Sequence, residues 1–239
     1  MIRVDRVPEP PDFETLVRRP GQAALLELIG DPAAPPRRGP RRQKVADRIA
    51  DIPAANLPTC WRDCLPQLRA AYRDTCAYLG MKIHAATGAA TIDHFRPKAA
   101  HQELAYEWSN FRLAAQQVNA NKGEHEDVID PFEVEDGWFE LNVGTFEIRA
   151  SPGIDPQQRI RIELTIARLN LNEPTFCKTR EEYHDRYHGL GEAVRGDLRE
   201  ALPLAWLREE CPYVASELER QARLREADGG TIPAPNIEP

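Results

Sequence analysis

The chain has 239 residues, of which 41% are hydrophobic and 29% charged, and its formal net charge is −7. Its length and apolar content are enough for one or two domains with a buried core. The negative charge excludes a protein that binds nucleic acid through its overall charge, so a polyanion would have to meet a local patch, a metal ion or a partner.

The sequence also indicates a compartment. It contains no run of 18 apolar residues, and its first residues are charged and rich in proline, so we expect neither a membrane span nor a signal peptide. Five cysteines, without the spacing of a disulfide framework, are typical of reduced thiols. We therefore expect a soluble, cytoplasmic protein with no membrane partner.

The first 55 residues are rich in proline and arginine and predict an extended arm with one short helix around Gln22–Ile29. Basic residues cluster between positions 37 and 44. Two interpretations stay open: a solvated tether, which the composition favours, and an arm that contacts nucleic acid.

Residues 57–79 have a helical period, which places a stripe of apolar side chains on one face. Cys60 and Cys64 are spaced as helical neighbours and could bind a metal ion, but buried thiols are the more common reason for such a pair. The stripe comprises Trp61, Leu65, Leu68, Tyr72 and Cys76.

The rest of the chain mixes short strands with helices. TIDHF at 91–95 predicts a strand, and the alternation around a glycine over 134–150 predicts a β-hairpin. After Asp155 the apolar spacing is helical, with a break at Pro203 and a loose tail after the last helix.

One window in the middle of the chain concentrates chemically active side chains. Asp93 and His94 are neighbours on the predicted strand, where successive side chains point to opposite faces. Hydrolysis of a phosphodiester needs a base that activates water and a cation that holds the phosphate, and this pair can supply a base and a metal ligand. An amide or backbone oxygen can fix the imidazole tautomer, and Asn110 is placed for this. Asn119 can complete a hard-cation site, and Lys122 can neutralise a phosphate.

The same residues resemble a known family. D-H-F-R-P-K, then W-S-N-F, then N-A-N-K-G look like the motif of the ββα-metal, or HNH, endonucleases. The resemblance implies that His94 is the general base, that Asn110 orients it, and that Asp93 and Asn119 bind a divalent cation, Mg²⁺ or another such as Mn²⁺. It also implies a central ββα-metal core within an α+β, mostly α-helical chain.

More distant stretches extend the resemblance. MIRVDRVPEPPDF, CAYLG, IDPFEVEDG and ARLNLNEPTFCKTR are similar to the Septu-type, PtuB-like HNH proteins of bacterial anti-phage systems, some of them encoded beside retrons. This similarity implies a PtuA-like ATPase partner. We expect an extended arm over 1–55, the nuclease core over 56–133, the β-hairpin and C-terminal helices over 134–228, and a flexible tail over 229–239.

The chain departs from that family at its cysteines. Family members bracket the motif with two Cys-x-x-Cys pairs that hold a structural zinc, whereas this chain has Cys76 and Leu79, then Ala115 and Val118, at those positions. A lone thiolate cannot hold tetrahedral zinc. We expect no structural zinc here and a small hydrophobic plug in its place.

Several further side chains have two interpretations. Arg96 and Lys98 could contact phosphates or lie on a surface turn. His101 and His125 could line the rim of the site, and Trp108 favours packing over base stacking. His184 and His188 share a helix face, but no H-E-x-x-H glutamate lies between them, so a solvated face is favoured over a metal site.

Together these features predict a metal-dependent endonuclease, the effector of an anti-phage system that works with an ATPase. DNA is the first expected substrate, and RNA, tRNA included, is the rival, because the motif reads a phosphate. The alternative is an inactive HNH-fold adaptor that only binds the ATPase, although an adaptor has no need of all four motif residues.

Overall fold

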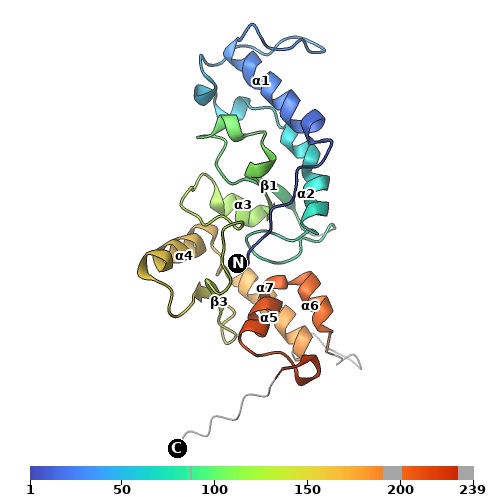
Figure 1. Ribbon diagram of the computed structural model, residues 1–239, viewed down its shortest axis with the longest axis vertical. Coiled ribbons are helices and arrows are strands. Elements are labelled where there is room, and N and C mark those ends of the chain that lie inside the picture. The colour runs from blue at the N-terminus through green and yellow to red at the C-terminus, as the bar shows by residue number, and fades with distance from the viewer. Residues whose placement is uncertain (87, 191–200, 231–239) are drawn as a thin grey trace, which may run out of the picture. The chain divides into compact units, whose positions relative to one another are not determined.

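The computed structural model describes residues 1–86, 88–190 and 201–230 (Figure 1). The described chain is α+β and mostly helical, as the sequence predicted, with two small antiparallel sheets. It divides into two compact units. The N-terminal unit comprises residues 5–76 and 83–127, and the C-terminal unit comprises residues 1–4, 77–82 and those from 128 onward.

The N-terminal unit contains a two-stranded sheet and several helices. Its α-helices are α1 (Arg19–Ile29), α2 (Leu65–Ala71) and α3 (Gln116–Lys122), and its strands are β1 (Ala90–His94) and β2 (Phe111–Ala115). A π-helical turn, Glu14–Arg18, precedes α1, and short 3₁₀ helices cover Ile49–Asp51, Ala54–Asn56, Cys60–Cys64, Gln102–Leu104 and Trp108–Asn110.

Strands β1 and β2 pair antiparallel, with Asp93 opposite Arg112 and His94 opposite Phe111. The strand that the sequence predicted at 91–95 is therefore confirmed. Helix α3 begins directly after β2 and packs on both strands. This strand–strand–helix succession brings the two ends of the chemically active window together.

The first 55 residues contain the expected short helix, α1, but they pack against the rest of the unit where an extended arm was expected. Phe13, Val17 and Leu25 are buried, and the Phe13 ring lies edge-on to Trp108 and Phe111, with centroids 5.5 and 5.8 Å away. The arm interpretation missed these apolar residues, whose helical spacing forms one buried face. Trp108 is buried, as its packing interpretation predicted, and its indole N–H donates to the Val7 carbonyl at 2.9 Å.

Helix α1 also lies very close, at Gly21, to the segment that connects β1 and β2. A Cβ atom at this position would lie 2.1 Å from Cγ of Tyr106, far inside a van der Waals contact. The Tyr106 ring is buried, and its hydroxyl donates to the Pro58 carbonyl at 3.0 Å. Only glycine lets the helix and this ring pack at such a distance.

The basic cluster at 37–44 is partly used inside the fold. The Glu27 carboxylate is buried on α1 and pairs with Arg42 at 2.7 Å and Arg37 at 3.5 Å. Burial raises the pKa of Glu27, but these two guanidinium groups outweigh it and hold the pKa below its usual value. Part of the cluster therefore stabilises the chain's own packing.

The helix predicted over 57–79 is shorter than expected. It consists of the 3₁₀ turn Cys60–Cys64 followed by α2, which ends at Ala71. Arg73 and Asp74 have positive φ values of 50° and 59°, which end the helix. The expected stripe is nonetheless buried at Trp61, Leu68 and Cys76.

The C-terminal unit combines the predicted hairpin with helices. It contains β3 (Phe139–Leu141) and β4 (Ile148–Ala150), which pair antiparallel, and α4 (Pro156–Leu169), α5 (Pro174–His188), α6 (Leu204–Glu210), α7 (Pro212–Arg220) and the 3₁₀ turn Glu226–Asp228.

The hairpin and the helical region are confirmed, with changed boundaries. Helix α5 ends where Gly189 takes a φ of 69°, and α6 begins after Pro203. Helix α7 ends at Arg220, before the predicted end at Asp228. The helical expectation for 191–200 and the tail from 231 lie outside the described residues. Within the described ranges, none of the helices has the length and apolar character to cross a bilayer.

Candidate active site

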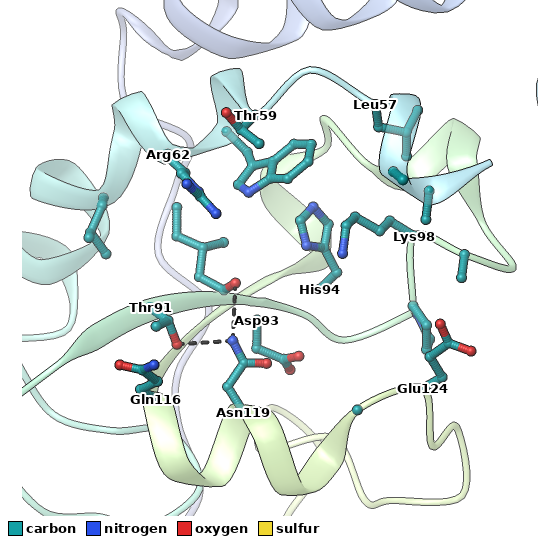
Figure 2. Close-up of a pocket in the computed structure, with 18 of the residues that line it drawn as sticks. Leu57, Thr59, Arg62, Thr91, Asp93, His94, Lys98, Gln116, Asn119 and Glu124 are labelled. Atoms are coloured by element: carbon teal, nitrogen blue, oxygen red, sulfur yellow. Dashed lines mark hydrogen bonds between the residues drawn. The ribbon is translucent and has the colours of Figure 1, made fainter. Parts of the chain in front are cut away.

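A pocket of about 580 Å³ lies in the N-terminal unit, beside β1 and α3. It is lined by three of the four residues to which the sequence assigned the metal and the base chemistry, together with residues from 54–65, the segment that leads into α2 (Figure 2). The polar and charged lining residues are Thr59, Arg62, Thr91, Asp93, His94, Lys98, Gln116, Asn119 and Glu124. Asn110 is buried beneath the strand connection and is not among them.

His94 is held between aromatic rings at the last position of β1. The Trp61 ring lies edge-on at a centroid distance of 5.0 Å, and the Phe111 ring at 5.2 Å. The imidazole Nε2 lies 2.9 Å from the Ala105 carbonyl oxygen. Because a carbonyl oxygen can only accept, the neutral ring carries its hydrogen on Nε2, and Nδ1 is the acceptor.

The environment of His94 keeps it neutral. Burial lowers its pKa to about 4, and the charges of Lys98 and Lys122 act in the same direction, against the Ala105 hydrogen bond. At neutral pH the ring is therefore uncharged, with Nδ1 as a lone-pair acceptor. A general base must be unprotonated before it accepts a proton, and the ring meets that requirement.

Asp93 and Lys122 form a buried ion pair. Both side chains are almost fully enclosed, and Lys122 Nζ lies 3.2 Å from Asp93 Oδ1. The ammonium also donates to the His94 carbonyl at 3.0 Å. The sequence suggested that Lys122 neutralises a phosphate, but its side chain is 0% exposed. In this structure Lys122 neutralises Asp93 from inside the protein and ties α3 to the end of β1.

The orientation of the Asn119 amide follows from its neighbours. The Thr91 hydroxyl donates to the Ala114 carbonyl at 3.0 Å, so its oxygen can accept the Asn119 Nδ2 hydrogen, 3.0 Å away. A longer contact, 3.5 Å, joins Nδ2 to the Ile92 carbonyl. With the nitrogen committed, the amide oxygen turns toward the Asp93 carboxylate (Figure 2).

These two groups are the donors that could hold a metal ion. A carboxylate and an amide oxygen suit a hard cation such as Mg²⁺ or Mn²⁺, which binds through few protein ligands and keeps several waters. Within the described ranges, no three His, Cys, Asp or Glu side chains form a metal-binding group. The fit is therefore to a cation held by Asp93, Asn119 and oxygens from water or substrate.

Asn110 acts on the strand connection. Its Oδ1 accepts from the Arg96 backbone N–H at 2.8 Å, and its Nδ2 donates to the carbonyls of Arg96 and Leu104 at 3.0 and 3.2 Å. The oxygen that touches the His94 ring belongs to Ala105, the residue after Leu104. Asn110 therefore holds the connection that carries the orienting carbonyl.

The two basic residues of the strand connection occupy different positions. Lys98 lines the pocket, with Nζ 5.8 Å from the centroid of the Trp61 ring. Arg96 is exposed and lies over the Phe95 ring, and it does not line the pocket.

The other four histidines that the sequence singled out lie elsewhere. His101 pairs with Glu126, and His125 lies 4.0 Å from Asp127, and neither lines the pocket. His184 and His188 lie on α5 in the C-terminal unit, with ring centroids 4.5 Å apart.

The cysteines are free thiols. Burial raises the pKa of Cys60 to about 11 and that of Cys64 to about 12, which disfavours thiolate ligands at both positions. At the positions where HNH proteins of the resembled type hold zinc, Cys76 is buried and its Sγ accepts from the Ala115 N–H at 3.3 Å, and Val118 is also buried.

Several residues in or next to the pocket carried no signal in the sequence. Trp61 and Arg62 belong to a segment about thirty residues before the motif, and Trp61 was predicted only as part of an apolar stripe. Glu124 lies just after the last residues of the motif, where a glutamate indicates no particular role. Ala105 acts through its backbone carbonyl, which its residue type does not reveal. The sequence matches no protein-family model and no curated protein.

Proposed function

We propose that this protein is a divalent-metal-dependent endonuclease of the HNH type, which hydrolyses phosphodiester bonds of nucleic acid in the pocket beside β1. The observation that carries the proposal is the state of His94. A neutral imidazole, fixed in one tautomer by the Ala105 carbonyl, shares a pocket with the two oxygen donors of Asp93 and Asn119.

His94 supplies the base of the proposed reaction. Nδ1 accepts a proton from a water molecule, and the water oxygen attacks the phosphorus and expels the ester oxygen. The ring is charged after this transfer, and the Ala105 carbonyl, which already accepts from the Nε2 hydrogen, stabilises that charge. Trp61 and Phe111 restrict the ring to one plane, so the base does not have to be ordered when substrate arrives.

Asp93 and Asn119 would hold the cation. When bound, a divalent cation supplies positive charge to the phosphate and to the departing oxygen. Lys122 compensates part of the Asp93 charge, so the protein alone offers a modest negative potential. We therefore expect weak binding of the cation without substrate and tighter binding together with a phosphate.

The biological setting rests on the resemblance to Septu-type proteins. It supports a role as the nuclease effector of an anti-phage system with a PtuA-like ATPase partner. A partner of this kind would also explain how a chain of net charge −7 reaches a polyanion. DNA is the first expected substrate and RNA, tRNA included, the second.

The test is a cleavage assay with plasmid, single-stranded DNA and total RNA in Mg²⁺ or Mn²⁺, with and without the ATPase. We expect cleavage by the wild type and its loss in His94→Ala. His101→Ala is the matched control, because it removes an imidazole that does not line the pocket. Equal cleavage by wild type and His94→Ala would reject His94 as the base.

The second candidate function is an adaptor that keeps the fold and binds the ATPase without cleavage. It predicts that the wild type cuts no substrate under any of these conditions, and that Asp93→Asn and His94→Ala leave ATPase binding unchanged. If the wild type cleaves and both variants lose cleavage, the adaptor function is rejected.

A further inference from the structure

The wall of the pocket that faces the motif comes from a different part of the chain. The segment Leu57–Leu65 contributes Thr59, Trp61 and Arg62 to the lining. Contacts on its buried side hold this segment in place: Trp61 is buried against the His94 ring, and the Cys64 thiol donates to the Trp61 carbonyl. A rigid wall with polar side chains therefore stands opposite β1.

Arg62 is the cation on this wall. Its side chain is exposed and enters the pocket on the side of His94 away from Lys98 (Figure 2). Among the described residues, no carboxylate forms a salt bridge with Arg62. The same holds for Arg96, so what distinguishes Arg62 is its place in the pocket lining. An arginine held over a pocket without an acidic partner retains its hydrogen-bond donors for a ligand.

The chemistry of the pocket indicates that ligand. A guanidinium presents parallel N–H donors that match two phosphate oxygens, and Lys98 provides a second positive charge across the His94 ring. A phosphodiester attacked at His94 has phosphates on both sides of it along the strand. Arg62 and Lys98, which flank His94, are placed to hold these neighbouring phosphates.

Building on the proposed nuclease function, we propose that Arg62 is a substrate-binding residue that holds a phosphate next to the one that is cleaved. Lys98 contacts the phosphate on the other side. Arg62 does not contact the reacting atoms; it fixes the register of the strand in the pocket. The ligand class is a single strand of nucleic acid, or a strand end or loop, that can enter a pocket of about 580 Å³.

The experiment separates binding from cleavage. Affinity for a labelled oligonucleotide is measured in the His94→Ala background over a series of NaCl concentrations, with Arg62→Ala, Arg62→Lys and Arg19→Ala compared. Arg19 is the matched control, because it is a largely exposed arginine of the same unit that does not line the pocket. Cleavage rates of the same substitutions are measured with His94 intact.

We expect Arg62→Ala to weaken binding roughly tenfold and to reduce the slope of log K against log salt by about one, the loss of one phosphate contact. Arg62→Lys retains the slope but not the full affinity, because an ammonium lacks the paired donors. Arg19→Ala changes neither. The cleavage rate at low substrate falls with affinity in Arg62→Ala.

Two results overturn the inference. One is an Arg62→Ala variant with the affinity, salt slope and cleavage rate of its parent, which leaves the nuclease function intact. The other is an equal effect of Arg19→Ala, which would mean that only overall charge matters. If neither the wild type nor any variant cleaves but the Arg62-dependent slope remains, the nuclease function fails and the phosphate site stands. If nothing binds and nothing is cleaved, with or without the ATPase, both fail.

Discussion

Two histidines of the described chain, His94 and His188, have a pKa lowered to about 4, mainly by burial. His188 lies on α5 of the C-terminal unit, between the rings of His184 and Tyr187 at 4.5 and 4.7 Å. The neighbouring charges of His184 and Arg225 lower its pKa further. By ionisation and aromatic packing alone, the two sites are alike.

They differ in what surrounds the ring. His94 has Nε2 fixed by a backbone carbonyl and lines a pocket with Asp93 and Asn119, whereas His188 contacts aromatic rings and does not line that pocket. A lowered pKa is thus a product of packing. A candidate base is distinguished by a fixed tautomer and by partners for the rest of the reaction.

The largest effect expected from this comparison is on cleavage. His94→Ala should reduce the rate roughly 10²- to 10⁴-fold, the range for a lost general base. His188→Ala should leave the rate unchanged, although it removes a histidine of similar pKa. Single-turnover assays measure both. A large loss of rate in a folded His188→Ala variant would place catalysis in the C-terminal unit and contradict the proposed site.

The next effect is on stability and concerns the buried charge beside His94. Lys122→Met leaves the Asp93 carboxylate buried without its ammonium, which should cost about 3–5 kcal/mol of unfolding free energy. Lys178→Met, the control on α5, removes a solvent-exposed pair with Glu181 and should leave the free energy of unfolding nearly unchanged. Urea unfolding distinguishes them.

A double variant sharpens this result. Asp93→Asn combined with Lys122→Met removes both charges, so it should be more stable than Lys122→Met alone. If the two substitutions simply add, Asp93 and Lys122 do not act as a pair.

A smaller effect concerns acid stability. The folded pKa of His94, about 4, lies below the unfolded value of about 6.5, so between these values the unfolded chain binds a proton that the folded chain does not. His94 therefore contributes to stability above pH 6.5, and the contribution is lost as the pH falls toward 4. Between pH 6.5 and 5 this loss is about 2 kcal/mol.

The comparison of variants tests that assignment. His94→Gln should be less sensitive to acid than the wild type, and His188→Gln should show a smaller change, because His188 is only half-buried and solvent weakens its charge interactions. Unfolding at pH 7 and pH 5 measures both. Identical acid sensitivity of wild type and His94→Gln would contradict the buried, neutral ring.

The smallest expected effect is that of a chelator on folding. Neither unit depends on a zinc–thiolate site in our interpretation, so EDTA should abolish cleavage yet leave the melting temperature unchanged. A drop in melting temperature, accompanied by zinc in elemental analysis of the untreated protein, would show a metal site built from Cys60, Cys64 or Cys76.

The local elements could be predicted where the sequence carries a period or a turn signal. The strand ending at His94, the hairpin before Ala150 and helix α4 follow from alternation, from a glycine turn and from helical spacing. The packing of the first 30 residues could not be predicted in this way. Phe13 is buried because it meets Trp108 and Phe111, residues about a hundred positions away, and no local pattern encodes that contact.

The candidate site shows the same division. Asp93, His94 and Asn119 stood out as residue types at a recognisable spacing, and the structure places all three around one pocket. The interior position of Lys122 could not be read from its charge, because lysine is usually exposed. The carbonyl of Ala105 could not be found at all, since backbone oxygens are present at every position.

The contact between Gly21 and Tyr106 has a consequence for how portable the motif is. Tyr106 follows Ala105, whose carbonyl fixes the His94 ring, and the ring of Tyr106 is wedged against a helix from the beginning of the chain. The geometry of the motif therefore depends on a helix outside it. A fragment beginning at residue 56 would lack the helix surface against which Tyr106 packs. Grafting the motif onto another scaffold would require an equivalent glycine-bearing helix to keep the His94 ring in position.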